Sequence, residues 1–127
     1  MQLEVTDEKL AQYRAEAHFL RAYYTHLLWK FWGNIPYFTE PLPAPLYMAK
    51  QMKADEVYAE IMKDIEAASS NALPMNYSKS DANVGRITKA AVMMLKARVV
   101  MYQKDAARYA DVTKDMAEII NSGKYKL

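Results

Sequence analysis

The sequence contains no cysteine among its 127 residues, which excludes disulfides, thiol catalysis and cysteine-ligated metal sites. No run reaches the ~18 apolar residues that a membrane-spanning helix needs. The polar, acidic start from Met1 to Glu8 does not have the pattern of a signal peptide. Taken literally, we expect a soluble chain, and it can equally be an interior piece of a longer exported protein.

Neither sign of charge is in large excess, with 17 Lys and Arg against 15 Asp and Glu. A net charge of +2 is too small to favour nucleic acid or an anionic membrane as a partner. A hydrophobic content of 52% argues against disorder, and the scarcity of glycine (3 residues) favours helix. The length is that of a single domain or part of one.

Apolar residues at alternating spacings of three and four predict a long helix over 7–32. Thr6 is its expected N-cap, and Gly33-Asn34 can adopt the left-handed conformation that ends a helix. Because this helix is apolar over most of its circumference, we expect it to be central in the fold. Its apolar positions are Leu10, Tyr13, Ala17, Leu20, Tyr24, Leu27 and Phe31, widened by Phe19, Tyr23 and Leu28.

Three further helices are predicted at 54–71, 89–103 and 106–121. Thr88 is the expected N-cap of the second of these, and Asp105 that of the third. The last two are joined by about two residues, so we expect them to pack antiparallel.

Two connections differ in character. The proline-containing strap Ile35–Met52 carries too many apolar side chains for a loose linker, so we expect it to lie, ordered, across the helices. Residues 75–86 are polar and rich in turn formers, which makes them the best candidate for a mobile loop. Tyr125 and Leu127 are candidates for a tail that folds back.

The first and third helices echo each other at one fixed offset, which suggests a repeat. We predict an all-α fold of two tetratricopeptide-like antiparallel hairpins, about four helices, with the strap inserted in the first. The matching residues are Ala15, Leu20, Arg21 and Ala22 against Ala90, Leu95, Lys96 and Ala97.

No residues with a catalytic, metal-binding or cofactor-binding pattern stand out. His18 and His26 form no HxxxH pair and have no evident third ligand, so ordinary packing or surface roles are the simpler interpretation. The carboxylates are scattered, and phosphate loops, nucleophile elbows and dinucleotide fingerprints are missing. We therefore expect no enzyme activity and no cofactor, and the ligand-binding residues stay unknown.

Two side-chain groups on and after the first helix allow alternative interpretations. Arg14 and Arg21 are expected to be structural, paired with Glu16 or a backbone carbonyl, with an anion site as the alternative. The aromatic residues around the first turn and the strap are expected mainly to pack in the core and in the strap, although flat rings also bind sugars. These aromatics are Trp29, Trp32, Tyr37, Phe38 and Tyr47; Met93, Met94, Met101 and Met116 are expected to fill gaps in the core.

Five segments, in order, resemble the SusD/RagB family of nutrient-binding proteins. Residues 16–24, EAHFLRAYY, are similar to its E-A-x-F-L-R-A helix, and 31–36, FWGNIP, to its F-G-D-V-P turn, with Trp32 inserted and Asn34 for Asp. Further likenesses are DEVYAEIMKDIEAA at 55–68, GRITKAA with LKAR at 85–91 and 95–98, and IINSGKYKL at 119–127.

The resemblance implies the helical scaffold of a glycan- or peptide-binding lipoprotein on the outside of the outer membrane, which is not an enzyme. It also implies a SusC-like TonB-dependent transporter as partner, and no nucleic acid. Because the lipid-accepting cysteine of the family is missing, we expect membrane attachment only through an anchor absent from this chain. We expect residues 1–127 to form one helical scaffold domain, a fragment of a longer protein.

Two rival hypotheses remain. A stand-alone tetratricopeptide module that binds a partner protein would need a continuous polar concave face, whereas these helices are apolar almost all round. A carbohydrate-active enzyme would need catalytic residues that are not evident. If the chain is a fragment, part of its apolar surface should be exposed or covered by another copy.

Overall fold

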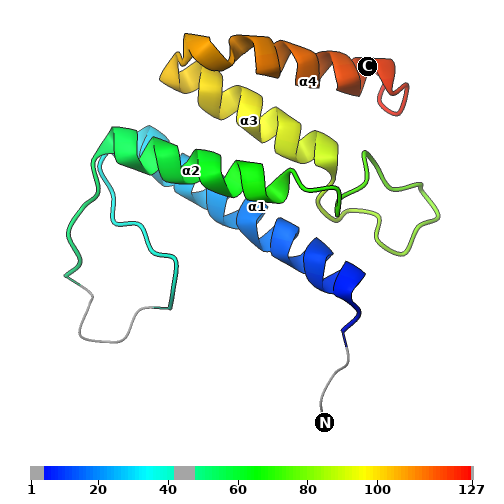
Figure 1. The fold of residues 1–127 in the computed structure, drawn as a ribbon, viewed down its shortest axis with the longest axis horizontal. Coiled ribbons are helices and arrows are strands. Elements are labelled where there is room, and N and C mark those ends of the chain that lie inside the picture. The colour runs from blue at the N-terminus through cyan, green and yellow to red at the C-terminus, as the bar shows by residue number, and fades with distance from the viewer. Residues whose placement is uncertain (1–4, 42–47, 127) are drawn as a thin grey trace.

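The computed structural model describes residues 5–41 and 48–126, and its regular structure there is helical (Figure 1). Successive helices run in opposite directions, so that α1 pairs with α2 and α3 with α4, as the two predicted hairpins require (Figure 1). The elements are α1 (Asp7–Trp32), α2 (Ala54–Ala68), α3 (Lys89–Gln103), the short 3₁₀ turn η2 (Ala106–Arg108) and α4 (Tyr109–Asn121).

The bounds of α1 and α3 confirm the prediction, because both helices carry strong local signals. The Thr6 hydroxyl accepts from the Lys9 amide at 3.4 Å, and the Thr88 hydroxyl accepts from the Ala91 amide at 3.2 Å. Gly33 ends α1 with a φ of 69°, a conformation that favours glycine. Lys104 ends α3 with a left-handed φ of 60°.

α2 ends at Ala68, three residues before the predicted end. The Ser69 hydroxyl donates to the Ile65 carbonyl at 2.7 Å. Serine side chains compete in this way with the backbone for helical hydrogen bonds, and two more turn formers, Ser70 and Asn71, follow. At the other end, the Asn34 side chain accepts from the Ala54 amide at 2.9 Å, so a residue of the turn after α1 satisfies the first amide of α2.

The prediction of one helix over 106–121, capped by Asp105, was wrong in its first turn. That turn is η2, and the side chain of Asp105 makes no capping hydrogen bond. The Asp105 carboxylate instead accepts from the Tyr58 hydroxyl at 2.8 Å and lies 3.4 Å from Arg108 Nε. The side chain of Asp105 is thus directed to Tyr58 of α2 and to Arg108 instead of to the first amides of its own helix.

The core lies mainly along α2 and α3. α2 packs against both α1 and α3, and six aliphatic side chains of α2 and α3 are fully buried. α1 buries one side only, although we expected a central helix, and its outer side remains rich in exposed apolar groups. The fully buried set is Val57, Ile61 and Ile65 of α2 with Val92, Val99 and Val100 of α3.

The connection between α1 and α2 is the stretch for which the strap is predicted. Its two ends are joined by an antiparallel bridge in which the Met52 amide donates to the Ile35 carbonyl at 2.9 Å. Residues 42–47, with Tyr47, lie outside the described residues. That the strap lies across the helices therefore stays a prediction.

The loop 75–86 is attached at several points. The Tyr125 hydroxyl donates to the Met75 carbonyl at 2.9 Å, which brings the C-terminal tail back as expected for Tyr125. Leu127 is outside the described part of the chain. Beside the loop, the Lys89 amide donates to the Pro74 carbonyl at 2.8 Å. The mobility of this loop stays a prediction, and these contacts show where it is held.

Candidate functional site

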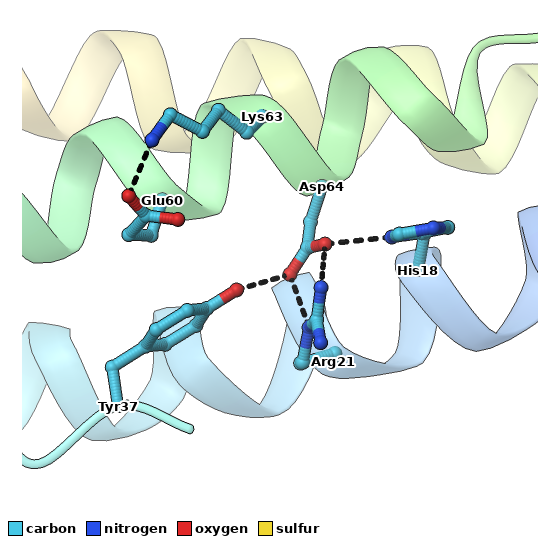
Figure 2. Close-up of polar contacts among 6 residues, drawn as sticks. All are labelled: His18, Arg21, Tyr37, Glu60, Lys63 and Asp64. Carbon is cyan, nitrogen blue, oxygen red and sulfur yellow. Dashed lines mark hydrogen bonds and ion pairs between the residues drawn. The ribbon is translucent and has the colours of Figure 1, made fainter. Parts of the chain in front are cut away.

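The most heavily bonded polar group is the buried carboxylate of Asp64 on α2, whose side chain is 3% exposed. Arg21 of α1 donates to both of its oxygens, from Nε at 2.7 Å and from the terminal nitrogen at 2.6 Å. His18 Nδ1 lies 2.7 Å from Oδ1, and the Tyr37 hydroxyl donates to Oδ2 at 2.8 Å. Figure 2 shows the three side chains converging on the carboxylate. We call these four residues the Asp64 cluster.

The electrostatics of the cluster keep Asp64 ionised. Burial opposes this by raising the pKa, but the hydrogen bonds from Arg21, His18 and Tyr37 outweigh it and hold the pKa of Asp64 below its ordinary value. Burial and the bond to Asp64 raise the pKa of the Tyr37 hydroxyl, so it stays protonated and donates. The Arg21 guanidinium also lies over the Tyr37 ring, 5.6 Å from its centroid.

This arrangement joins three parts of the chain, namely α1, α2 and the segment after α1. An acid–base pair for hydrolysis needs a second carboxylate facing the first. The partners of Asp64 are a guanidinium, an imidazole and a phenol, and nearby Glu60 is bonded to Lys63 at 2.5 Å (Figure 2). The cluster therefore fixes α1, α2 and the start of the strap to one another.

The cluster also corrects the predicted partner of Arg21. We expected Glu16 or a backbone carbonyl, but the partner is Asp64. Asp64 lies in the 55–68 segment of the family resemblance, but no role was predicted for it, although the helical pattern carries a signal. Asp64 shares the apolar face of α2 with Ile61 and Ala68, where a carboxylate needs a buried partner. Arg14 is exposed and forms no ion pair within the described ranges.

Glu16 instead anchors the polar loop. Its carboxylate accepts from Arg86 at 2.9 and 2.5 Å and from Gln12 Nε2 at 3.0 Å. Gln12 also donates to the Tyr77 hydroxyl at 3.1 Å, and the Arg86 guanidinium lies 5.2 Å from the centroid of the Tyr13 ring. Both polar clusters on α1 are thus engaged within the chain.

The predicted aromatic cluster is dispersed. Trp29 is buried, donates from Nε1 to the Ala54 carbonyl at 3.0 Å and meets Tyr102 edge-on with centroids 5.0 Å apart, which confirms its core role. Trp32 is 70% exposed and contacts only Phe31 among the ring pairs of the described chain. Phe38 is also exposed, so neither Trp32 nor Phe38 lies in the core, and packing of these rings within the strap stays a prediction.

A groove of about 480 Å³ runs between α1 and α3. Its floor includes the buried His26, whose Nδ1 has no hydrogen-bond partner in the described structure. Burial first, then the charges of Lys30 and Arg98, lower the pKa of His26, so its imidazole is neutral at pH 7. The groove is lined by Tyr23, His26, Leu27 and Lys30 of α1 and by Leu95, Arg98, Met101 and Tyr102 of α3.

The described residues offer neither a metal site nor a membrane-spanning helix. Within residues 5–41 and 48–126, no three acidic or histidine side chains are grouped so that they could hold a metal ion. None of the helices described is both long and apolar enough to cross a membrane.

Several solved structures are similar to this chain. Surface glycan-binding protein A from Bacteroides fluxus is 57% identical over 99% of this chain, with a TM-score of 0.89. The protein of the same name from Bacteroides uniformis is 38% identical over 98%, with a TM-score of 0.89. The one from Bacteroides thetaiotaomicron, in complex with laminarihexaose, is 40% identical over 98%, with a TM-score of 0.84.

These matches cover 26%, 27% and 25% of the three longer proteins, so the chain spans about a quarter of their length. A comparison with curated protein sequences found no match. A SusD-like family model, described as "Starch-binding associating with outer membrane", matches residues 2–101, including α1, α2 and most of α3. With this match and the 57% identity to the Bacteroides fluxus protein, the chain belongs to the SusD-like family.

Proposed function

We propose that this chain is the helical scaffold of a SusD-like protein that captures oligosaccharides at the outer membrane. The family model and the names of the similar structures support glycan binding as the function of the whole protein. The chain spans about a quarter of those structures, so its own task is a part of theirs. The proposal includes a lipid anchor, an outward orientation and import through a SusC-like TonB-dependent transporter, as the family resemblance implies.

The observation that carries the scaffold role is the internal engagement of the polar side chains. A sugar-binding site presents polar groups that converge on a pocket and are available to hydroxyls. Here the Asp64 cluster and the bonds of Glu16 to Arg86 and Gln12 direct these groups at one another. Such bonds hold helices at fixed angles, which is what a rigid support for a neighbouring site requires.

The partner-binding tetratricopeptide module is less well supported. Its groove would be polar, whereas the exposed face of α1 carries Leu20, Tyr24, Leu28 and Phe31. The similar structures are glycan-binding proteins in which this unit is one part of a larger chain. As for the enzyme hypothesis, Asp64 accepts from Arg21 and Tyr37 and does not face the second carboxylate that hydrolysis needs.

Laminarihexaose is the appropriate first ligand, because one similar structure contains it. Calorimetry would compare three proteins: this chain, the Bacteroides thetaiotaomicron protein, and a chimera of that protein in which this chain replaces the matching quarter. We expect the complete protein and the chimera to bind, and this chain alone not to bind. Cellohexaose and maltohexaose test whether linkage matters.

Two results would contradict the scaffold role. The first is binding by this chain alone, which would move the site onto its own surface; loss of that binding in Trp32→Ala would place it at the end of α1. The second is a chimera that is folded by circular dichroism and does not bind, which would mean that this quarter supplies specific ligand contacts.

A further inference from the structure

Exposed apolar side chains of α1 and α3 flank the α1–α3 groove, and we call them the groove-flanking face. Leu20, Tyr24 and Leu28 are spaced four residues apart on α1 and are 44%, 61% and 51% exposed. Phe31 extends this row, and across the groove Met101 of α3 is 57% exposed. Exposed apolar side chains grouped in this way are typical of an interaction site.

The groove beside this face carries positive charge and an unused hydrogen-bonding group. Lys30 and Arg98 line it, and neither forms an ion pair with any residue in the described ranges. His26 is 93% buried in it, with an orphan Nδ1. Buried polar atoms of native proteins nearly always have a partner, so the described chain leaves one hydrogen-bonding group unused beside the groove.

We propose that this face is a docking surface for an apolar polypeptide segment that carries a carboxylate, supplied by the part of the SusD-like protein beyond this chain. The apolar side chains of the segment cover Tyr24, Leu28 and Met101. Its carboxylate enters the groove between Lys30 and Arg98. This inference rests on the proposal that the chain is part of a longer glycan-binding protein.

Two observations favour that occupant. The similar structures are about four times as long as this chain, so ample further polypeptide is present in such proteins to cover the face. A second copy of this chain fits poorly, because a symmetric contact over the groove would bring two copies of Lys30 and Arg98 together. An acidic segment instead meets both cations with opposite charge.

The absence of cysteine makes the proposal directly testable. Three single-cysteine variants would be made: Met101→Cys on the face, Lys63→Cys on the polar side of α2, where the lysine is 69% exposed, and Val99→Cys in the core at 0%. Each is placed in the 127-residue chain and in a chimera of the Bacteroides fluxus protein, which is 57% identical. The rate of alkylation by iodoacetamide is followed by mass spectrometry of the peptide concerned.

We expect Met101→Cys to be modified at least about tenfold more slowly in the chimera than in the chain alone, because docking removes the thiol from solvent. Lys63→Cys should react equally in both, and Val99→Cys should be protected in both. Adding Arg98→Glu to the chimera should restore most of the reactivity at position 101, whereas Arg98→Lys should not.

Equal reactivity at position 101 in the two proteins would overturn the proposal. Protection in the isolated chain that increases with protein concentration would overturn it in favour of a second copy. If Val99→Cys reacts in the isolated chain, that chain is not folded alone. The test is then the ratio of the alkylation rates of Met101→Cys and Lys63→Cys within the chimera, and a ratio near one would overturn the proposal. None of these readouts uses a sugar, so failure here is distinct from failure to bind laminarihexaose.

Discussion

The substitution Asp64→Asn tests whether the Asp64 cluster is the main polar tie of this fold. The change keeps the shape of the side chain and removes the charge that faces Arg21. Breaking a buried ion pair typically costs about 3–5 kcal/mol. The Arg21 side chain is 32% exposed, so water can solvate part of the guanidinium left behind. We therefore expect the free energy of unfolding to fall by about 2–3 kcal/mol, which lowers Tm by roughly 10 °C in a chain of this length.

Urea unfolding followed by circular dichroism at pH 7 measures this loss. Glu60→Gln on the same helix is the matched control, because its partner Lys63 is 69% exposed and surface pairs contribute at most about 0.5–1 kcal/mol. Tyr37→Phe removes one of the bonds to Asp64 and should cost about 1 kcal/mol. An Asp64→Asn protein within about 0.5 kcal/mol of the wild type would refute the reasoning.

The Asp64→Asn variant should also differ from the wild type in how its stability changes at low pH. The folded-state pKa of Asp64 lies below its ordinary value, so its contribution is complete above about pH 4 and is lost as the pH falls through the lowered value. Asp64→Asn should therefore lose less stability than the wild type below about pH 4. If the free energy of unfolding decreases equally in the two proteins below about pH 4, Asp64 is not held ionised in the folded state.

Three further predictions follow from burial and backbone conformation. Trp29→Ala should cost about 3–5 kcal/mol in urea unfolding, because the ring is 4% exposed, whereas Trp32→Ala at 70% exposure should cost less than about 0.5; similar losses would contradict the assignment of one to the core and the other to the surface. Burial lowers the pKa of His26, so the folded protein resists protonation of this side chain, and the free energy of unfolding falls as the pH drops below the ordinary histidine pKa of 6.5. The variant His26→Phe should therefore show a smaller decrease in Tm between about pH 6.5 and 5. An unaltered pH dependence of Tm would exclude His26 as its source. Gly33→Ala places a side chain at a φ of 69° and should destabilise by about 1–2 kcal/mol, measured as the urea midpoint, while no effect would mean that the turn relaxes readily.

Local sequence signals predicted most of the helices, because helix caps act within a few residues. Thr6 and Thr88 sit three residues from the amides they accept from, and the chain order alone reveals such pairs. The end of α2 and the first turn of α4 were predicted less well. At those points Ser69 and Asp105 bond to groups that a cap rule does not consider.

The polar clusters could not be predicted in the same way. Arg21 and Asp64 are 43 residues apart, and Glu16 and Arg86 are 70 apart. Which charged residues form a pair depends on how the packed helices are rotated and shifted against each other, and the local sequence pattern does not contain this information. The local pattern also does not distinguish the buried Trp29 from the exposed Trp32. They lie one helical turn apart, yet only Trp29 faces another element of the described chain.

The two ends of the α1–α2 connection are held by hydrogen bonds, which bears on how much sequence change the stretch between them tolerates. The Ile35–Met52 bridge, the Asn34 bond to Ala54 and the Tyr37 bond to Asp64 hold both ends of the connection in place. Closing a flexible loop costs only about 0.6 kcal/mol more for each doubling of its length. Because these bonds lie outside the stretch from Phe38 to Gln51, a library of insertions there should leave the contacts between α1 and α2 in place.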